Sequence, residues 1–145
     1  MKKDFESINN IAIFYVFGCG VNRNIDRALL LFEQAAENGV EVANYNIALL
    51  NNVVTSIKRN DKYYNLYTYC IKAINSGVVG AKTLLALNKI MCNDAMDRKD
   101  PPSGACSCGS SEIIELFKES ASDGDIWANY HLGEYLLYKV RSVES

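Results

Sequence analysis

Three short stretches of the sequence contain residue types that support phosphate binding, metal binding or proton transfer. Gly18-Cys19-Gly20 places two glycines around a thiol, Cys106-Ser-Cys108 brings two thiols close together, and His131 is the one histidine. Closely spaced glycines occur in nucleotide-binding loops, cysteine pairs bind zinc, and histidine titrates near neutral pH. Each of these chemistries needs further residues at a defined spacing.

The glycine pair lacks the residues that phosphate binding requires. A dinucleotide-binding loop needs a third glycine, for which Arg23 stands here, and a Walker-type loop ends in Gly-Lys-Ser/Thr, which is missing. The helical pattern on both sides of the stretch also argues against a preceding strand. We therefore predict a corner between two helices, with Asn24 capping the second one.

The cysteine pair and the histidine are also incomplete as sites. Structural zinc is commonly held by four Cys or His ligands, and the nearest further candidate is Cys92, well before Cys106 and Cys108. We expect two thiols in an irregular loop, able to form an adventitious disulfide, and no metal or cofactor. His131 has no Ser or Cys partner at a telling spacing, so we expect a non-enzyme. Burial of His131 beside a cysteine and a carboxylate would instead favour the hypothesis that the chain is an enzyme.

The composition is that of an ordinary globular domain. The chain has 145 residues, 49% of them hydrophobic and 22% charged, with a net charge of −2 and no basic block. This length predicts one domain over residues 1–145, and the charge argues against nucleic acid as a partner. The five cysteines form no regular disulfide framework, which favours a cytoplasmic location. No apolar run is long enough to span a membrane.

The N-terminus offers one alternative location. Lys2 and Lys3 precede a short apolar run, and Val16–Cys19 resembles a lipoprotein cleavage site. A lipid-anchored periplasmic protein would carry a lipid on Cys19. Asp4 and Glu6 place acid where a secretory signal needs positive charge, and the apolar run is short, so we disfavour this alternative.

A degenerate repeat gives the clearest information about the fold. Residues 28–48, 66–86 and 113–133 align without gaps. Each copy has a helical apolar pattern, a glycine that suits a helix end, an alanine four residues later and a further small residue. The glycines are Gly39, Gly77 and Gly124, and the final small residues are Ala48, Ala86 and Gly133, with Ala12 as their N-terminal counterpart.

This pattern predicts an all-α fold: a short α-solenoid of about seven helices in antiparallel pairs, forming a right-handed superhelical stack. Small side chains let neighbouring helices approach closely. The predicted helices cover residues 4–17, 25–38, 41–55, 62–76, 79–93, 110–122 and 125–141. The repeat units cover residues 4–39, 40–77 and 78–124, with a loop insertion at 94–109, and helix 125–141 caps the stack.

The first unit resembles the Sel-one-like repeat, a relative of the tetratricopeptide repeat. The matching residues are Tyr15, Gly18, Gly20, Val21, Arg27, Ala28, Phe32, Ala35, Ala36, Gly39 and Ala43. The resemblance extends more weakly over nearly the whole chain. Residues 57–65 replace the glycine corner of the second unit, and the third unit carries the insertion. The resemblance implies a non-catalytic module that binds proteins.

By analogy with the tetratricopeptide groove, the first helix of each pair lines an inner face. The predicted partner-binding residues on this face are Asn9, Ile13, Phe17, Tyr45, Leu49, Thr83, Leu87, Trp127, Tyr130, Glu134 and Tyr138. Such an apolar face is either an exposed groove or a core closed by tight curvature, and periodicity does not separate the two.

The sequence therefore predicts an interaction scaffold that binds a protein or peptide partner through this inner face. As an alternative, the small and slightly acidic chain is an immunity or inhibitor protein that neutralises a bacterial toxin by direct binding. The partner is then a toxin or a secretion-related protein. We expect a monomer or a weak dimer.

Overall fold

The computed structural model describes residues 4–53, 62–97 and 109–144. Within these ranges the chain forms seven α-helices and no β-strand, which confirms the predicted all-α class. The helices are α1 (Phe5–Phe17), α2 (Ile25–Glu37), α3 (Glu41–Val53), α4 (Lys62–Asn75), α5 (Ala81–Asp97), α6 (Ser110–Ser122) and α7 (Ala128–Glu144).

The glycine-cysteine-glycine stretch is a corner between α1 and α2, as predicted. Gly18 has a φ of 73° and ends α1, and its N–H donates to the carbonyl of Phe14 at 2.8 Å. Only glycine adopts this left-handed conformation without a steric cost. The side-chain oxygen of Asn24 accepts the N–H of Arg27 at 2.9 Å and so caps α2.

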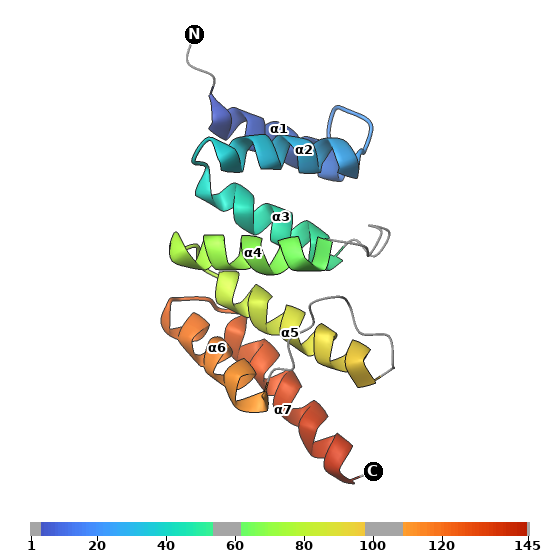
Figure 1. The fold of residues 1–145 in the computed structure, drawn as a ribbon, viewed down its shortest axis with the longest axis vertical. Helices are drawn as coiled ribbons and strands as arrows, with labels where there is room; N and C mark the ends of the chain where they lie inside the picture. The colour runs from blue at the N-terminus through green and yellow to red at the C-terminus, as the bar shows by residue number, and fades with distance from the viewer. Residues whose placement is uncertain (1–3, 54–61, 98–108, 145) are drawn as a thin grey trace.

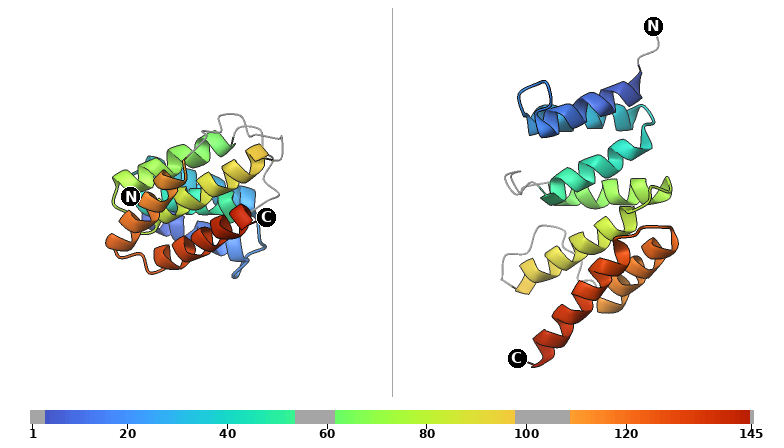
Figure 2. Two further views of the ribbon diagram at one scale, coloured as in Figure 1. Left: turned by 90° about the horizontal axis from the view of Figure 1, so that it is seen from below. Right: turned by 180° about the vertical axis from the view of Figure 1, so that it is seen from behind.

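The helices follow one another along the long axis of the molecule, with the two termini at opposite ends (Figure 1). Each helix packs against the next one in the sequence, and α3 also contacts α5. The view from behind shows the same elongated stack, and the view from below looks along it, so that the helices overlap (Figure 2). Contacts therefore join mainly sequence neighbours. The right-handed superhelical path stays a prediction.

The hydrophobic core is divided into three clusters along this stack. The first surrounds Phe32 and joins α1, α2 and α3. The second contains Leu66 and Cys70 and joins α3, α4 and α5, and the third surrounds Phe117 and joins α5, α6 and α7. Each cluster buries side chains from consecutive helices, so the fold is held together locally.

Small residues sit where the first helix of each pair meets the second. Ala12 in α1, Ala48 in α3 and Ala86 in α5 occupy equivalent positions of the repeat, and all three are fully buried. Their α7 counterpart, Gly133, is exposed, and no atom lies within 4 Å of the place that a Cβ would occupy. Among the described residues, α7 therefore lacks the covering helix that its three counterparts have.

The bounds of α5 and α7 differ most from those predicted: α5 begins at Ala81 instead of residue 79, and α7 ends at Glu144 instead of residue 141. Helix α5 ends at Asp97 instead of residue 93, so it includes the first residues of the predicted insertion at 94–109. Helix α7 is regular only from Ala128, because the N–H of Trp127 donates to the Asp125 carboxylate at 3.0 Å and residues 125–127 form its first turn. Residues 98–108 lie outside the described ranges.

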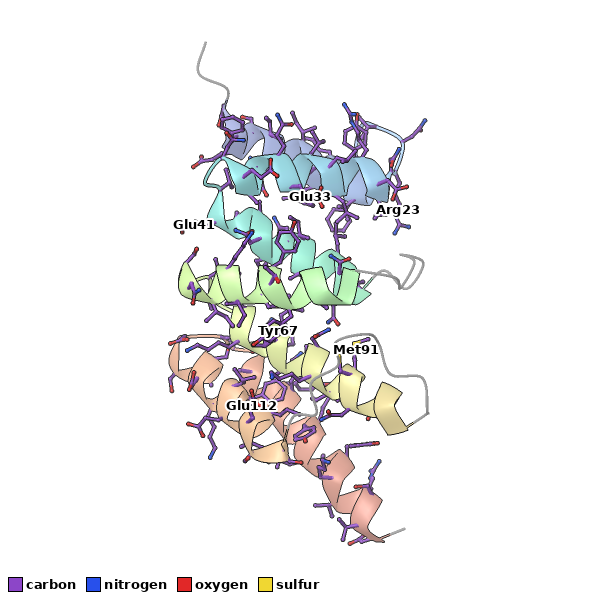
Figure 3. All side chains as sticks on the ribbon, in the orientation of Figure 1. Arg23, Glu33, Glu41, Tyr67, Met91 and Glu112 are labelled. Carbon is purple, nitrogen blue, oxygen red and sulfur yellow. The ribbon has the colours of Figure 1, made fainter. Side chains whose placement is uncertain are left out.

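Polar contacts tie α5 to both of its neighbours. The ammonium of Lys89 lies 2.9 Å from the Glu112 carboxylate on α6 and 5.8 Å from the ring centroid of Tyr67 on α4. Figure 3 labels Tyr67 and Glu112, and α5 lies between their two helices. Lys82 binds two further carboxylates of α6 and the turn after it, at 3.1 and 2.8 Å. These pairs link α5 to α6 at both ends of their contact.

Candidate functional site

Exposed aromatic side chains gather at the start of α7 and along one side of it. Trp127 is 61% exposed, Tyr130 is 56% exposed and Tyr138 is 54% exposed. Spacings of three and four residues place Trp127, Tyr130, Glu134 and Tyr138 along one side of the helix. We call these four residues the aromatic stripe. Aromatic side chains are the commonest anchors of protein interfaces.

The stripe is ordered by contacts among its own members. The rings of Trp127 and Tyr130 meet edge to face, with centroids 6.3 Å apart. The Tyr130 hydroxyl donates to the Glu134 carboxylate at 2.9 Å, and this hydrogen bond raises the pKa of Tyr130. The phenol is therefore held as a neutral donor beside a carboxylate, next to an exposed indole.

A buried polar cluster anchors the start of the stripe to the stack. Asp125 is buried, and one of its carboxylate oxygens accepts hydrogen bonds from Thr83 on α5 and from Ser120 on α6. The other oxygen accepts the N–H of Trp127 at 3.0 Å. The hydroxyl oxygens of Thr83 and Ser120 also lie 3.0 Å apart. One carboxylate therefore joins three helices and orients the turn that carries the indole.

His131 packs behind the stripe and is half-buried. Its ring stacks on Phe117 with centroids 6.4 Å apart and meets Tyr130 edge to face at 5.3 Å. Its Nδ1 lies 3.3 Å from the second oxygen of Glu134. These contacts give the imidazole a packing role, in which it joins the aromatic stripe to the third core cluster.

The eleven residues predicted for the inner face do not form one continuous surface. The exposed ones are Phe17, Leu49, Trp127, Tyr130, Glu134 and Tyr138; the half-buried ones are Ile13, Tyr45 and Leu87; the buried ones are Asn9 and Thr83. The face therefore divides into a mostly closed middle and an exposed region on α7, with Phe17 exposed at the far end of the stack.

Asn9 and Thr83 are the predicted residues that the structure removes from any accessible face. The side-chain oxygen of Asn9 accepts from the side-chain amide of Asn46 at 3.1 Å, which links α1 to α3, and Thr83 belongs to the Asp125 cluster. Buried polar side chains need such partners, and neighbouring helices provide them here. Both residues join helices inside the stack.

Tyr45 takes an intermediate position. Its ring packs against the second core cluster, and a Cβ on Gly80 would lie 3.4 Å from its hydroxyl oxygen. Burial, followed by the nearby Asp125 carboxylate, raises the pKa of Tyr45. The side chain therefore contributes to packing between α3 and α5, and loss of Tyr45 would disturb the fold.

Several exposed apolar side chains lie outside the predicted set. Four of them gather in the last turns of α7: Leu136, Leu137, Val140 and Val143. The repeat alignment contains a signal for these residues. It aligns Leu136 and Leu137 with residues of α1 and α5 that are half-buried or buried. Leu136, Val140 and Val143 point away from the aromatic stripe, whereas Leu137 borders it, two turns after Tyr130.

The cysteines described by the structure are spread over the stack. Cys19 is exposed at the corner, Cys92 is partly exposed and Cys70 is buried, where burial raises its pKa to about 12. Cys106 and Cys108, the predicted loop pair, lie outside the described residues. In the described part of the chain, no three His, Cys, Asp or Glu side chains converge as a metal site would require.

Comparison of the chain with protein-family models, with curated proteins and with solved structures finds no match. None of the helices in the described ranges combines the length and the apolar character needed to cross a bilayer. The function therefore has to be argued from the surface of the molecule itself.

Proposed function

We propose that this chain is a short α-solenoid of the Sel-one-like kind that acts as a protein-binding scaffold, with the aromatic stripe as its contact surface. The observation that carries the proposal is the exposure of Trp127, Tyr130 and Tyr138 on one side of a helix that is anchored by buried polar contacts. An exposed and pre-ordered aromatic surface favours binding, because little side-chain entropy is lost when a partner docks.

The chemistry of the stripe defines the partner that we propose. The indole and two phenol rings favour an apolar or proline-containing segment, and Glu134 adds an acceptor for a basic side chain or a backbone N–H. Helical-repeat scaffolds recognise extended segments through side chains spread along their helices. The proposed partner is therefore a peptide segment with apolar anchors and a positive charge.

Affinity capture with matched variants tests this function. The bait is the full chain, used in a lysate of the cells that produce it, and the variants are Trp127→Ala, Tyr138→Ala and the control Leu30→Ala. Leu30 is also an exposed apolar residue, but it lies on α2 at the other end of the stack (Figure 1). We expect specific partners to be retained by Leu30→Ala and lost from both aromatic variants.

Circular dichroism on the same variants separates binding from folding. Helix content and melting temperature should stay unchanged in Trp127→Ala and Tyr138→Ala, because both side chains are more than half exposed. Partners captured equally well by all four proteins would contradict the proposal. A loss of helix content that parallels the loss of binding would place the two aromatic residues in the core and would contradict it as well.

A further inference from the structure

A second side of α7 has the features of a helix-packing face. In α5, the residues that face α6 include Lys82, Ala86, Lys89 and Ile90, as shown by the two ion-paired lysines and the third core cluster. The repeat offset from α5 to α7 is 47 residues, the distance from Ala86 to Gly133. The equivalent residues of α7 are Asn129, Gly133, Leu136 and Leu137, and Val140 continues the row one turn later.

We call these five residues the open pair face of α7. Leu137 is 63% exposed and Val140 is also exposed, whereas Ala86 and Lys89 of α5 are buried. Gly133 offers a notch like the ones that Ala12, Ala48 and Ala86 offer to their partner helices. The end of a helical stack normally presents a polar face to water. This end is apolar, and the last turns of α7 extend beyond α6 (Figures 1 and 2).

We infer that a second copy of this chain covers the open pair face, with the two α7 helices packed antiparallel around a two-fold axis between Leu136 and Leu137. Within one chain, α1 pairs with α2, α3 with α4 and α5 with α6. In the dimer, α7 pairs in the same way with α7 of the second copy. An isologous contact requires a surface that complements itself. Gly133 then lies opposite the partner's Val140, so a notch receives a branched side chain, and the four leucines meet at the centre.

The charges beside the face have the same symmetry. Glu134 and Arg141 lie on one flank of α7, two turns apart, and both are exposed. In the antiparallel pair, Glu134 lies close to the partner's Arg141, and the symmetry operation repeats this contact at the other end. Opposite charges at such flanking positions set the orientation of paired helices.

The size of the contact determines how strong the dimer is. One helix of 17 residues from each copy forms it, which is a smaller area than the roughly 1,200 Å² at which stable interfaces begin. We therefore expect a concentration-dependent dimer with a dissociation constant on the order of 10–100 μM. The aromatic stripe borders this face, because Tyr130 and Leu137 are seven residues apart and Glu134 belongs to the stripe.

Sedimentation velocity of the full chain tests the inference, under reducing conditions that exclude disulfides through Cys19. From about 10 μM to about 1 mM, the observed mass should rise from 16.2 kDa towards twice that value. Leu137→Glu should stay monomeric throughout. Two controls, Leu30→Glu on α2 and Phe14→Glu on α1, replace residues of similar exposure and should dimerise like the original chain.

A charge-reversal pair tests the orientation. Glu134→Arg or Arg141→Glu alone should weaken the dimer about fivefold to tenfold, because each change brings like charges together twice. The double variant should recover the original dissociation constant, which a loss of folding could not do.

Three results would overturn the inference. The first is a wild-type chain that stays monomeric at about 1 mM, and the second is a dimer that persists in Leu137→Glu. The third is an assembly larger than a dimer that is lost in Phe14→Glu, because such an assembly would indicate head-to-tail stacking. Each of these outcomes leaves the partner-binding test on Trp127 and Tyr138 unaffected, since neither residue belongs to the open pair face.

Discussion

Asp125 stands where the two earlier copies of the repeat carry Val40 and Val78. A carboxylate at a position otherwise filled by valine requires polar partners once it is buried, and Thr83 and Ser120 provide them. The repeat alignment contains the substitution, but it does not show which side chains face it. The cluster depends on residues from α5 and α6 that converge only in the folded stack, so periodicity could not predict it.

We expect Asp125→Ala to lower the free energy of unfolding by about 1–3 kcal/mol, because the hydroxyls of Thr83 and Ser120 lose their shared acceptor in the interior. Urea denaturation followed by circular dichroism measures the change. The matched control is Asp123→Ala, two residues earlier, which removes an exposed pairing with Lys82 and should cost less. Equal losses for the two variants would show that the buried cluster adds nothing beyond a surface ion pair.

At the scale of helices, the sequence was most informative where the structure is local. Glycine stops and apolar periodicity predicted all seven helices, because both reflect the conformation of a few consecutive residues. The end of α5 was predicted too early, because residues after 93 have no counterpart in the other copies. Exposure was predicted least well, since it depends on which helices cover a given side.

One position of the repeat illustrates this limit. Asn9, Tyr45, Thr83 and Tyr130 are equivalent in the alignment, yet two of them are buried, one is half-buried and Tyr130 is 56% exposed. Asn9 and Thr83 have hydrogen-bonding partners on other helices, whereas Tyr130 lies on α7, against which no later helix packs in the described residues. A side chain at the end of a stack is exposed by its place in the order of helices.

The connection between α2 and α3 provides a test at this scale. Gly39 has a φ of 88°, and a Cβ added to it would meet no atom within 4 Å, so only backbone conformation opposes a substitution. We expect Gly39→Ala to lower the free energy of unfolding by about 1 kcal/mol, and Gly39→Asn to lower it less, because asparagine tolerates the left-handed region better. Thermal denaturation of the two variants measures this order. Similar stability of the original chain and Gly39→Ala would contradict it.

The whole molecule is a row of three core clusters joined mainly through sequence neighbours, with an aromatic stripe and an open pair face at its C-terminal end. This arrangement concentrates the proposed binding surfaces on a terminal helix, which, like α1, packs mainly against one neighbouring helix. Helix α7 can therefore carry exposed aromatic and apolar residues while the first two clusters maintain the rest of the fold. Local cores of this kind also make stability differ along the chain.

A core substitution in the third cluster should reveal that local character. Phe117 is fully buried between α5, α6 and α7, so Phe117→Ala should cost about 3–5 kcal/mol in that cluster. We expect native-state hydrogen exchange to accelerate strongly in α6 and α7, less in α5, and little in α1 and α2, which share no core cluster with Phe117. Phe32→Ala in the first cluster is the matched control and should produce the opposite gradient. If exchange accelerated equally along all seven helices in both variants, the three clusters would unfold as one unit. A lower stability of either end cluster would then lower the protection of backbone amides against exchange in every helix.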